Sequence, residues 1–239
     1  MVKKKRIEVC FSPDQYGLYE QEYSTVVVID VLRATSAIVT AFQYGVKKII
    51  PVSTIEEAIA YKSKGYLVGA ERMGKIVEGF EFGNSPFAYM GKEVKGKTIV
   101  LTTTNGTRAI NLAAKDHHVV IGSLLNLDAL NEYLIELNEN TLILGSGWQG
   151  KFNLEDSICA GAITEALLDS RKFESDEDST IASLFLFKKA KDNYFGFLKA
   201  SSHRRRLRNL NLNKDIKYCL TPNQTNVIPV YKNGAIVKL

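Results

Sequence analysis

Cysteine is scarce in this chain of 239 residues, and its three copies lie far apart, at Cys10, Cys159 and Cys219. Their odd number and wide spacing exclude a disulfide framework and a cysteine-based metal motif. Free cysteine is among the residues most often buried, so we expect three reduced thiols in the core.

Long apolar runs are missing as well. No segment approaches the ~20 apolar residues that a membrane helix needs. The basic start, Lys3–Arg6, leads directly into a strand-like segment instead of the apolar core of a signal peptide. These absences predict a cytoplasmic protein without a membrane partner.

Several common catalytic signatures are also absent. The chain has no Walker loop and no GxGxxG, which removes support for nucleotide binding. It has no GxSxG elbow, which weakens a serine-hydrolase interpretation. No Asp-x-Asp follows the first strand, so the signature of the aspartyl-phosphate phosphatases is missing too.

Charge of either sign is only mildly in excess, with 31 basic and 26 acidic residues and a net charge of +5. The basic residues concentrate in Lys3–Arg6 and His203–Arg208. A nucleic-acid footprint is normally broader and carries exposed aromatic residues. The pattern favours small anionic substrates and predicts no nucleic-acid partner.

Short runs of Val, Ile and Leu alternate with helical patterns, as expected for strands that helices cover on both faces. The expected strands are Ile7–Phe11, Val26–Val31, Lys48–Val52, Tyr66–Ala70, Thr98–Thr103, His118–Gly122 and Thr141–Gly145. The expected helices are Ala34–Tyr44, Ile55–Ser63, Thr107–Ala114, Leu127–Leu137 and Leu154–Leu168. Thr54 with Glu57 resembles a capping box, and Asn126 suits an N-cap. This rhythm predicts an α/β fold, a layered α/β/α unit with a largely parallel sheet.

The rhythm changes after Ser170. We expect an acidic loop at Glu174–Asp178, one long helix over Thr180–Ala200, and shorter helices at His203–Asn209 and Lys214–Leu220. Asn233-Gly234 between two β-rich runs predicts a closing hairpin. Residues 1–239 are expected to form one unit, with a boundary near Gly96 if it divides into two compact lobes. Apolar residues on the late helix suit a homo-oligomer interface as well as a core.

A threonine-rich turn follows one of the expected strands. Leu101 is followed by hydroxyl-bearing, amide and basic residues and then by an amphipathic helix. The turn consists of Thr102, Thr103, Thr104, Asn105, Gly106, Thr107 and Arg108. Backbone N–H groups at a helix start bind anions, because the first four lack intrahelical partners. We therefore predict a phosphate or sulfonate site; the competing interpretation is a well-capped helix.

Acidic residues end two other strands, at the edge where open α/β sheets bind ligands. Asp30 suits a magnesium ligand, nucleophile or base, and Arg33 suits a bidentate phosphate contact. Thr35 and Ser36 open the helix that follows, and we expect both to bind the phosphate of a substrate. Glu71 is a second oxygen ligand for a divalent cation, with Arg72 beside it as an anion contact. The competing interpretations are that Asp30 caps the helix and pairs with Arg33, and that Glu71 forms a surface ion pair.

Three further segments contribute candidates. The loop with Asn84 and Ser85 can present amides to an anion or simply connect elements, with Ser85 capping a short helix. The glycine-rich segment with Ser146 and Gly147 indicates a close backbone approach to a ligand. Asp156 is a third acidic ligand or an N-terminal charge on its helix. His203 suits a general acid for a leaving alkoxide; the competing interpretation is that it belongs to a solvated basic face.

Together these segments resemble the 2-phosphosulfolactate phosphatase family (the ComB family). The resemblance rests on six segments in family order over nearly the whole length. They are Asp30–Ser36, Gly69–Arg72, Gly79–Pro86, Thr102–Arg108, Gly145–Gly150 with Glu155–Gly161, and Ser202-His203 with Asp215-Ile216 and Cys219. The chain departs from the family at Arg204, where the family has a glycine after the histidine.

The resemblance implies an α/β fold and a Mg²⁺-dependent phosphoric monoester hydrolase acting on a small acid. In the family's reaction, (2R)-2-phospho-3-sulfolactate and water give 3-sulfolactate and phosphate, a step towards coenzyme M. We expect Asp30, Glu71 and Asp156 at the metal, and Arg33 and the threonine-rich turn at the phosphate. Attack by water and attack by Asp30 remain alternatives. The competing hypothesis is a non-catalytic anion-binding module that senses a phosphorylated metabolite.

Overall fold

The computed structural model describes residues 3–19 and 23–239. Within these ranges the strands form one eleven-stranded sheet in the order β5-β4-β6-β3-β11-β10-β7-β2-β8-β1-β9. The strands are β1 (Lys5–Cys10), β2 (Thr25–Ile29), β3 (Lys48–Pro51), β4 (Leu67–Arg72), β5 (Lys75–Ile76), β6 (Thr98–Thr102), β7 (His118–Gly122), β8 (Thr141–Gly145), β9 (Phe173–Glu174), β10 (Pro229–Lys232) and β11 (Ala235–Lys238). The α/β fold predicted from the sequence is confirmed, with a mixed but largely parallel sheet.

Helices connect these strands and follow them at the C-terminal end. The α-helices are α1 (Ala34–Gln43), α2 (Ile55–Lys62), α3 (Gly106–Ala113), α4 (Leu127–Leu137), α5 (Leu154–Asp169), α6 (Asp178–Ala190), α7 (Tyr194–Phe197), α8 (Ser202–Asn209) and α9 (Asn213–Cys219). Short 3₁₀ helices are η1 (Pro13–Leu18), η2 (Pro86–Tyr89), η3 (Lys92–Val94), η4 (Leu124–Asn126) and η5 (Leu198–Ala200). In the described part of the chain, no helix combines the length and the apolar character that crossing a membrane requires.

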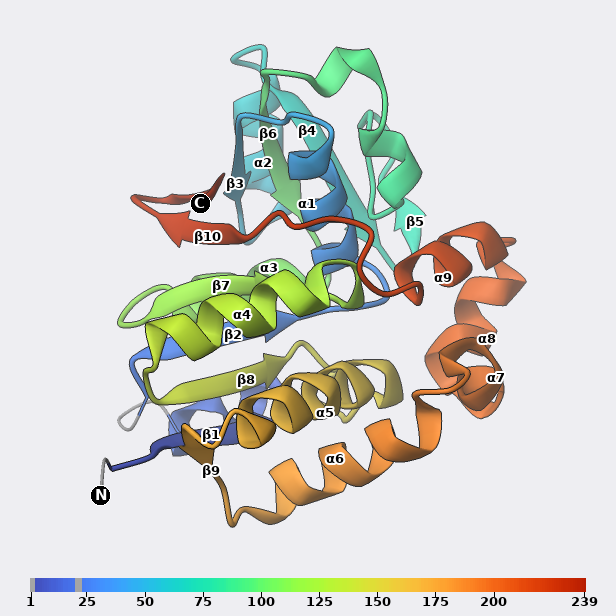
Figure 1. Cartoon of the computed structure of the whole chain (residues 1–239). Coiled ribbons are helices and arrows are strands. Elements are labelled where there is room, and N and C mark those ends of the chain that lie inside the picture. Colours follow the sequence, from blue (N-terminus) through green and yellow to red (C-terminus); the bar gives the residue numbers. More distant parts are fainter. Residues whose placement is uncertain (1–2, 20–22) are drawn as a thin grey trace.

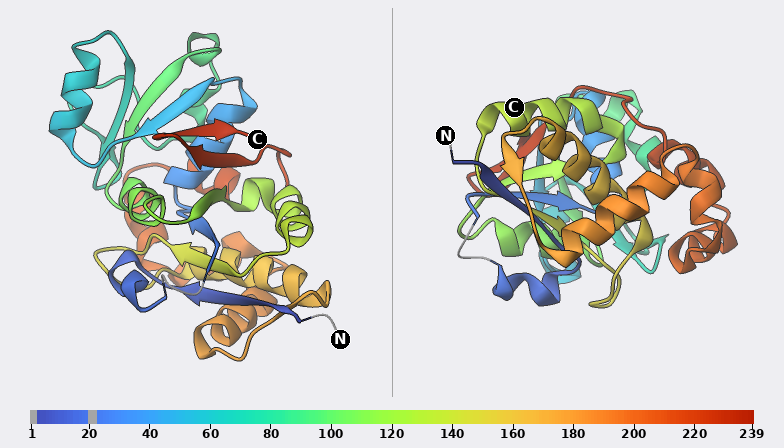
Figure 2. Two further views of the ribbon diagram at one scale, coloured as in Figure 1. Left: turned by 90° about the vertical axis from the view of Figure 1, so that its left-hand side faces the viewer. Right: turned by 60° about the horizontal axis from the view of Figure 1, so that its bottom comes forward.

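The sheet consists of two parallel blocks joined by an antiparallel hairpin. One block is β4-β6-β3, and the other is β7-β2-β8-β1-β9. The C-terminal hairpin β10–β11 lies between them and pairs antiparallel with β7 and β3. The strands of the smaller block run across the direction of β2, β7 and β8, as Figures 1 and 2 show. The ends of β2, β6 and β8 therefore approach one another. The division into lobes near Gly96 stays a prediction.

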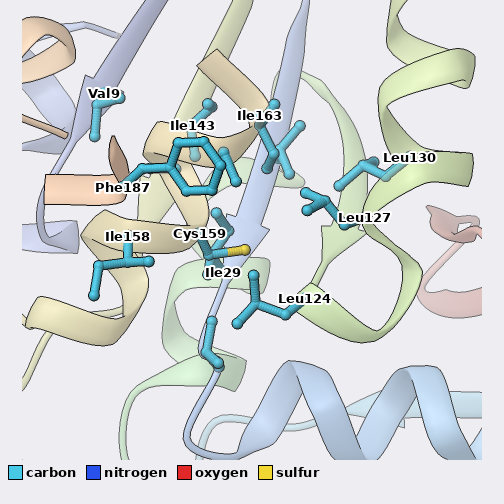
Figure 3. Close-up of a cluster of buried hydrophobic side chains, with 14 of the residues drawn as sticks. Val9, Ile29, Leu124, Leu127, Leu130, Ile143, Ile158, Cys159, Ile163 and Phe187 are labelled. Atoms are coloured by element: carbon cyan, nitrogen blue, oxygen red, sulfur yellow. The ribbon is translucent and has the colours of Figure 1, made fainter. Parts of the chain in front are cut away.

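Alternate residues of the central strands pack on opposite faces of the sheet. Val27 and Ile29 of β2 join the core under α4, α5 and α6, whereas Val26 and Val28 join the core under α1 and α3. Successive side chains of a strand point to opposite faces, so a strand covered on both sides must be apolar throughout. Figure 3 shows the first of these cores, where Cys159 of α5 packs with Phe187 of α6. All three cysteines are free and buried, as predicted.

Local polar chemistry decides several element ends. Thr54 caps α2 by accepting the N–H of Glu57, which confirms that predicted cap. Asn126 occupies the N-cap position of α4, as predicted, but its side chain makes no capping hydrogen bond to that helix and joins Ser123 in the capping box of the preceding η4. The Asn126 side chain accepts the N–H of Ser123 and donates to the carbonyl of Val227. Ser85 precedes η2 without a side-chain capping bond.

The predicted single helix over Thr180–Ala200 is wrong, because α6 ends at Ala190 and α7 starts at Tyr194. The Asn193 side chain accepts the N–H of Gly196 at 2.7 Å. Asparagine offers such local bonds in place of the helical ladder, and apolar spacing does not reveal them. The hairpin is confirmed: Asn233 and Gly234 both have positive φ, which a two-residue hairpin turn of this kind requires.

Candidate active site

A polar pocket lies where the two sheet blocks meet; about 350 Å³ of space lies between its walls and its open mouth, of which about 20 Å³ admits the centre of a water molecule. It takes residues from the ends of β2, β4, β6 and β8 and from the C-terminal helix α8. Its lining residues among those described are Asp30, Leu32, Arg33, Glu71, Gly74, Asn84, Thr104, Asn105, Gly147, Trp148, His203 and Leu207. Eight of the residues predicted from the sequence therefore share one pocket.

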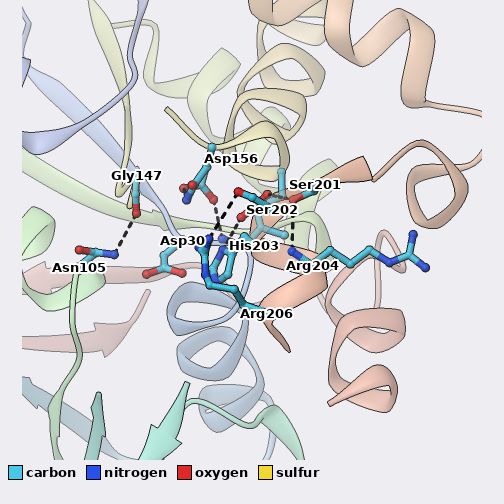
Figure 4. A network of polar contacts seen from close by, with 12 residues as sticks. Asp30, Asn105, Gly147, Asp156, Ser201, Ser202, His203, Arg204 and Arg206 are labelled. Carbon is cyan, nitrogen blue, oxygen red and sulfur yellow. Dashed lines mark hydrogen bonds and ion pairs between the residues drawn. The ribbon is translucent and has the colours of Figure 1, made fainter. Parts of the chain in front are cut away.

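Asp30 occupies the turn from β2 to α1. Its side chain accepts the N–H of Ala34 at 3.2 Å, and its own N–H donates to Thr35 Oγ1 at 3.0 Å. Asp30 thus caps α1 while its carboxylate borders the pocket (Figure 4). Burial raises the pKa of Asp30 from 3.8 to about 6, and the nearby His203 partly offsets this. The carboxylate is poised to accept a proton or a cation at neutral pH.

Arg33 lies beside Asp30 but pairs with a residue far along the chain. Its Nη1 donates to Asp215 of α9 at 2.7 Å, and its Nη2 donates to the carbonyl of Gly74 at 3.1 Å. Both side chains of this ion pair are almost completely buried. The pairing of Arg33 with Asp30, one of the interpretations open at the sequence level, does not occur. Asp215 holds the guanidinium in place at the pocket wall.

Glu71 ends β4 and is 6% exposed. Its carboxylate accepts the N–H of Gly74 and, at 2.8 Å, the side-chain amide of Asn84. Burial raises the pKa of Glu71, against the lowering effect of Arg33 and Arg72. Asn84 Oδ1 is buried and has no hydrogen-bond partner within residues 3–19 and 23–239, so it is an available oxygen acceptor next to this carboxylate.

Asp156 supports the Asp30 turn from the first turn of α5. Its Oδ1 accepts the N–H of Val31 at 2.9 Å, and its Oδ2 faces the Asn153 amide at 3.3 Å. Burial, followed by the charges of Asp30 and Glu155, raises the pKa of Asp156 well above its usual value. In the described residues, no three Asp, Glu, His or Cys side chains form a ready metal cluster.

His203 lies on α8 and lines the pocket from the C-terminal part of the chain. Its Nδ1 lies 2.6 Å from Glu155 Oε1, and that carboxylate is 1% exposed. The His203 ring also contacts the Trp148 ring, with centroids 5.7 Å apart. A buried carboxylate on one imidazole nitrogen fixes the ring orientation and leaves the other nitrogen for the pocket.

The residues of the threonine-rich turn line two neighbouring hollows. Thr104 and Asn105 line the pocket, and the Asn105 amide donates to the carbonyl of Gly147 at 3.0 Å. A Cβ on Gly106 would stand 3.1 Å from Asp30 Oδ2, so the start of α3 faces that carboxylate. Thr103, Thr104, Arg72 and Arg108 line a neighbouring open hollow on the outer side of the turn.

Most of the other predicted residues do not line the pocket and make local contacts. The backbone N–H of Thr103 donates to the Thr107 hydroxyl oxygen, and the backbone N–H of Thr107 donates to the Thr103 hydroxyl oxygen. Arg108 pairs with Asp14 at the surface. Ser36 donates to the carbonyl of Val31. Ser146 Oγ is buried without a partner. Gly147 has φ +60°, and a Cβ there would lie 2.6 Å from the carbonyl of Lys151, so local packing alone demands glycine.

Sequence reasoning did not assign a site role to Glu155, Trp148 or Asp215. Glu155 and Asp156 are adjacent on α5, and neighbours on a helix point roughly 100° apart. The sequence therefore offers two carboxylates without showing which one faces His203. The acidic pair at a helix start was the signal that the sequence offered. The partner of Glu155, His203, lies 48 residues away, and the sequence did not indicate that the two would meet.

The geometry defines a class: an α/β protein with an acidic pocket, a buried arginine, a helix start and an oriented histidine, a set suited to phosphoryl chemistry. A family model described as 2-phosphosulpholactate phosphatase matches residues 10–234. A protein named "Probable 2-phosphosulfolactate phosphatase" from Caldanaerobacter subterraneus is 45% identical over 215 residues, 88% of this chain and 89% of that protein. A protein of the same name from Clostridium acetobutylicum is 39% identical over 236 residues, 97% of this chain and 100% of that protein. The chain belongs to the 2-phosphosulfolactate phosphatase family, whose members are phosphoric monoester hydrolases.

Proposed function

We propose that this protein is a Mg²⁺-dependent phosphatase that hydrolyses (2R)-2-phospho-3-sulfolactate to 3-sulfolactate and phosphate. One observation carries the proposal: Asp30, Glu71, Arg33 and the Glu155–His203 pair converge on a single pocket. Each supplies a function that phosphomonoester hydrolysis requires, and the family of the chain supports the substrate class.

The donor set of the pocket fits a magnesium ion. Asp30 and Glu71 offer carboxylate oxygens, and both have raised pKa values because burial disfavours their charge. Asn84 Oδ1 and Thr104 Oγ1 add buried oxygens that have no hydrogen-bond partner in the part of the chain that the structure describes. Magnesium prefers such oxygen ligands and usually takes one or two carboxylates. We therefore place it at Asp30 and Glu71, with Asp156 as the third acidic candidate. When bound, the ion supplies positive charge that neutralises the phosphoryl oxygens.

The cationic groups of the chain hold the phosphoryl group. Arg33 faces the pocket with a guanidinium that Asp215 and Gly74 fix in place. The start of α3 contributes backbone N–H groups, which stabilise anions at a helix N-terminus. Donors fixed in advance stabilise the charge of the transition state without reorganisation cost.

His203 serves the leaving group. With Nδ1 bound to Glu155, its Nε2 delivers a proton to the ester oxygen as the P–O bond breaks, so the product leaves as an alcohol. Water balances the reaction: its hydroxyl group ends on phosphorus, and its other proton replaces the one that His203 gave to the leaving group. Leu32, Leu207 and Trp148 line the same pocket and restrict water around the reacting atoms.

The test is phosphate release from a panel of small phosphorylated carboxylates and sulfonates, with Mg²⁺ and with a chelator. We expect 2-phospho-3-sulfolactate to be cleaved fastest, and activity to disappear with the chelator and return with Mg²⁺. Tight binding of these compounds without phosphate release would instead indicate a sensor and contradict the proposal.

A further inference from the structure

An arginine with no role in the chemistry proposed above lies at the rim of the pocket. Arg206 follows His203 by three residues on α8, and its Cζ lies 4.4 Å from the centroid of the Trp148 ring. Trp148 itself lines the pocket and contacts His203. Figure 4 shows the Arg206 side chain alongside His203. Residues three apart on a helix share a face, so α8 presents both side chains to the same region.

The Arg206 guanidinium has N–H donors that are not used in hydrogen bonds with the described residues. Its Nη2 is buried and finds no hydrogen-bond partner in the described residues, and its Nη1 lies 3.5 Å from Ser202 Oγ. Partial burial lowers the pKa of Arg206, and the nearby Glu155 opposes this effect. A buried charged donor without an acceptor is costly. An anionic acceptor bound at this point would remove that cost.

The neighbouring arginines of α8 are already engaged elsewhere. Arg204 stacks on the Phe195 ring at 3.7 Å and donates to the carbonyl of Phe195. Arg205 donates to the carbonyl of Ala200 at 2.6 Å. Arg208 is exposed. Arg206 is thus the member of this run that combines a buried, unpartnered donor with a place beside the pocket.

We propose that Arg206, held against Trp148, binds the acidic group of the substrate that is not hydrolysed, a carboxylate or a sulfonate. This inference rests on the proposed function. In the proposed function Arg33, the magnesium ion and the start of α3 serve the phosphoryl group, so the second acidic group of the substrate needs a cationic contact of its own. Arg206 would distinguish phosphorylated acids from simple phosphate esters.

The test compares Arg206→Met with Arg208→Met. Methionine keeps an apolar side chain over Trp148 but removes the charge, and Arg208→Met removes the same charge from an exposed position. The substrates are 2-phospho-3-sulfolactate, 2-phospholactate without the sulfonate, the phosphate ester of 2-hydroxyethanesulfonate without the carboxylate, and phenyl phosphate without either.

We expect Arg206→Met to lose about 10- to 100-fold in kcat/KM on 2-phospho-3-sulfolactate, because hydrogen bonds to charged groups are worth about 1.5–3 kcal/mol. The loss on phenyl phosphate should stay below about threefold, and Arg208→Met should resemble wild type. If one truncated acid still shows the fall in kcat/KM for Arg206→Met, the acidic group that this substrate keeps is the one that Arg206 binds. An equal loss on all four substrates, or no loss on any, would overturn the inference.

A binding measurement separates this inference from the proposed function. If the wild-type protein releases no phosphate, the proposed function fails, and calorimetric binding of 3-sulfolactate then decides the role of Arg206. Weaker binding by Arg206→Met than by Arg208→Met supports the inference, and equal binding by the two variants rejects it.

Discussion

At the scale of single residues, Asp30 carries two roles in one side chain. It caps α1 through the N–H of Ala34, and it presents a carboxylate to the pocket. The capping role alone would favour an ionised carboxylate, yet burial raises the pKa to about 6. The site therefore holds an acid whose ionisation costs folding free energy, as is common where function rather than stability selects a residue.

This cost predicts that Asp30→Asn stabilises the metal-free protein at neutral pH. The folded pKa of about 6 exceeds the ordinary value of 3.8, so ionisation favours unfolding as the pH rises through this window. At pH 7.5 we expect the variant to gain about 1 kcal/mol, or roughly 2–4 °C in Tm. Near pH 4 the gain should vanish. Thermal denaturation in a chelator measures both, and an equal gap at the two pH values would show that the Asp30 charge is not the cause.

Glu155 illustrates a residue that acts through another residue. Its carboxylate orients His203 and lies buried on α5. We expect Glu155→Gln to lower kcat by about 10- to 100-fold with little change in KM, because partners that orient a functional histidine typically contribute this much. Steady-state kinetics provide the measurement. Glu165→Gln on the same helix is the control, since Glu165 lies 3.9 Å from Lys191 at the surface. Wild-type kcat in Glu155→Gln would remove Glu155 from the site.

At the scale of elements, the site is built from three repeated strand-to-helix turns. The turns β2–α1, β6–α3 and β8–α5 bring Asp30, Asn105 and Gly147 together. Continuous apolar runs made these strands predictable, and polar residues after them made the turns predictable. The insertion of β10–β11 between the blocks was not predictable, because strand order depends on contacts distant in sequence. Hydrogen bonds such as that of Asn193 likewise escape apolar spacing.

The packing of α5 against α6 depends on one glycine. A Cβ at Gly161 would stand 2.0 Å from the carbonyl oxygen of Ser183. We therefore expect Gly161→Ala to lower the free energy of unfolding by about 1–3 kcal/mol, the usual cost of overpacking a core. Urea denaturation measures this cost. The control is Gly17→Ala, where no heavy atom of the described residues lies within 4 Å of the added carbon. An unchanged midpoint for Gly161→Ala would show that the two helices move apart freely.

At the scale of the whole molecule, the pocket forms only when distant segments assemble. The N-terminal half supplies Asp30, Arg33 and Glu71, whereas α5 and α8 supply Glu155 and His203. The Arg33–Asp215 ion pair ties the start of α1 to α9 and so holds the C-terminal helices at the site. The sequence predicted the pocket-facing acids Asp30 and Glu71 from strand ends and His203 from a basic segment near the C-terminus. It did not predict their partners, which the fold brings from more than 40 residues away.

The role of this pocket as the active site is tested most directly by phosphate release from 2-phospho-3-sulfolactate, measured for Asp30→Asn and Arg33→Ala in the presence of Mg²⁺. Asp116→Asn, at an exposed position on the loop after α3, is the control. We predict that each pocket variant loses at least about 100-fold in kcat, the usual cost of removing a preorganised electrostatic contact, and that the control matches wild type. Turnover near the wild-type rate in both pocket variants would contradict the assignment of this pocket as the active site.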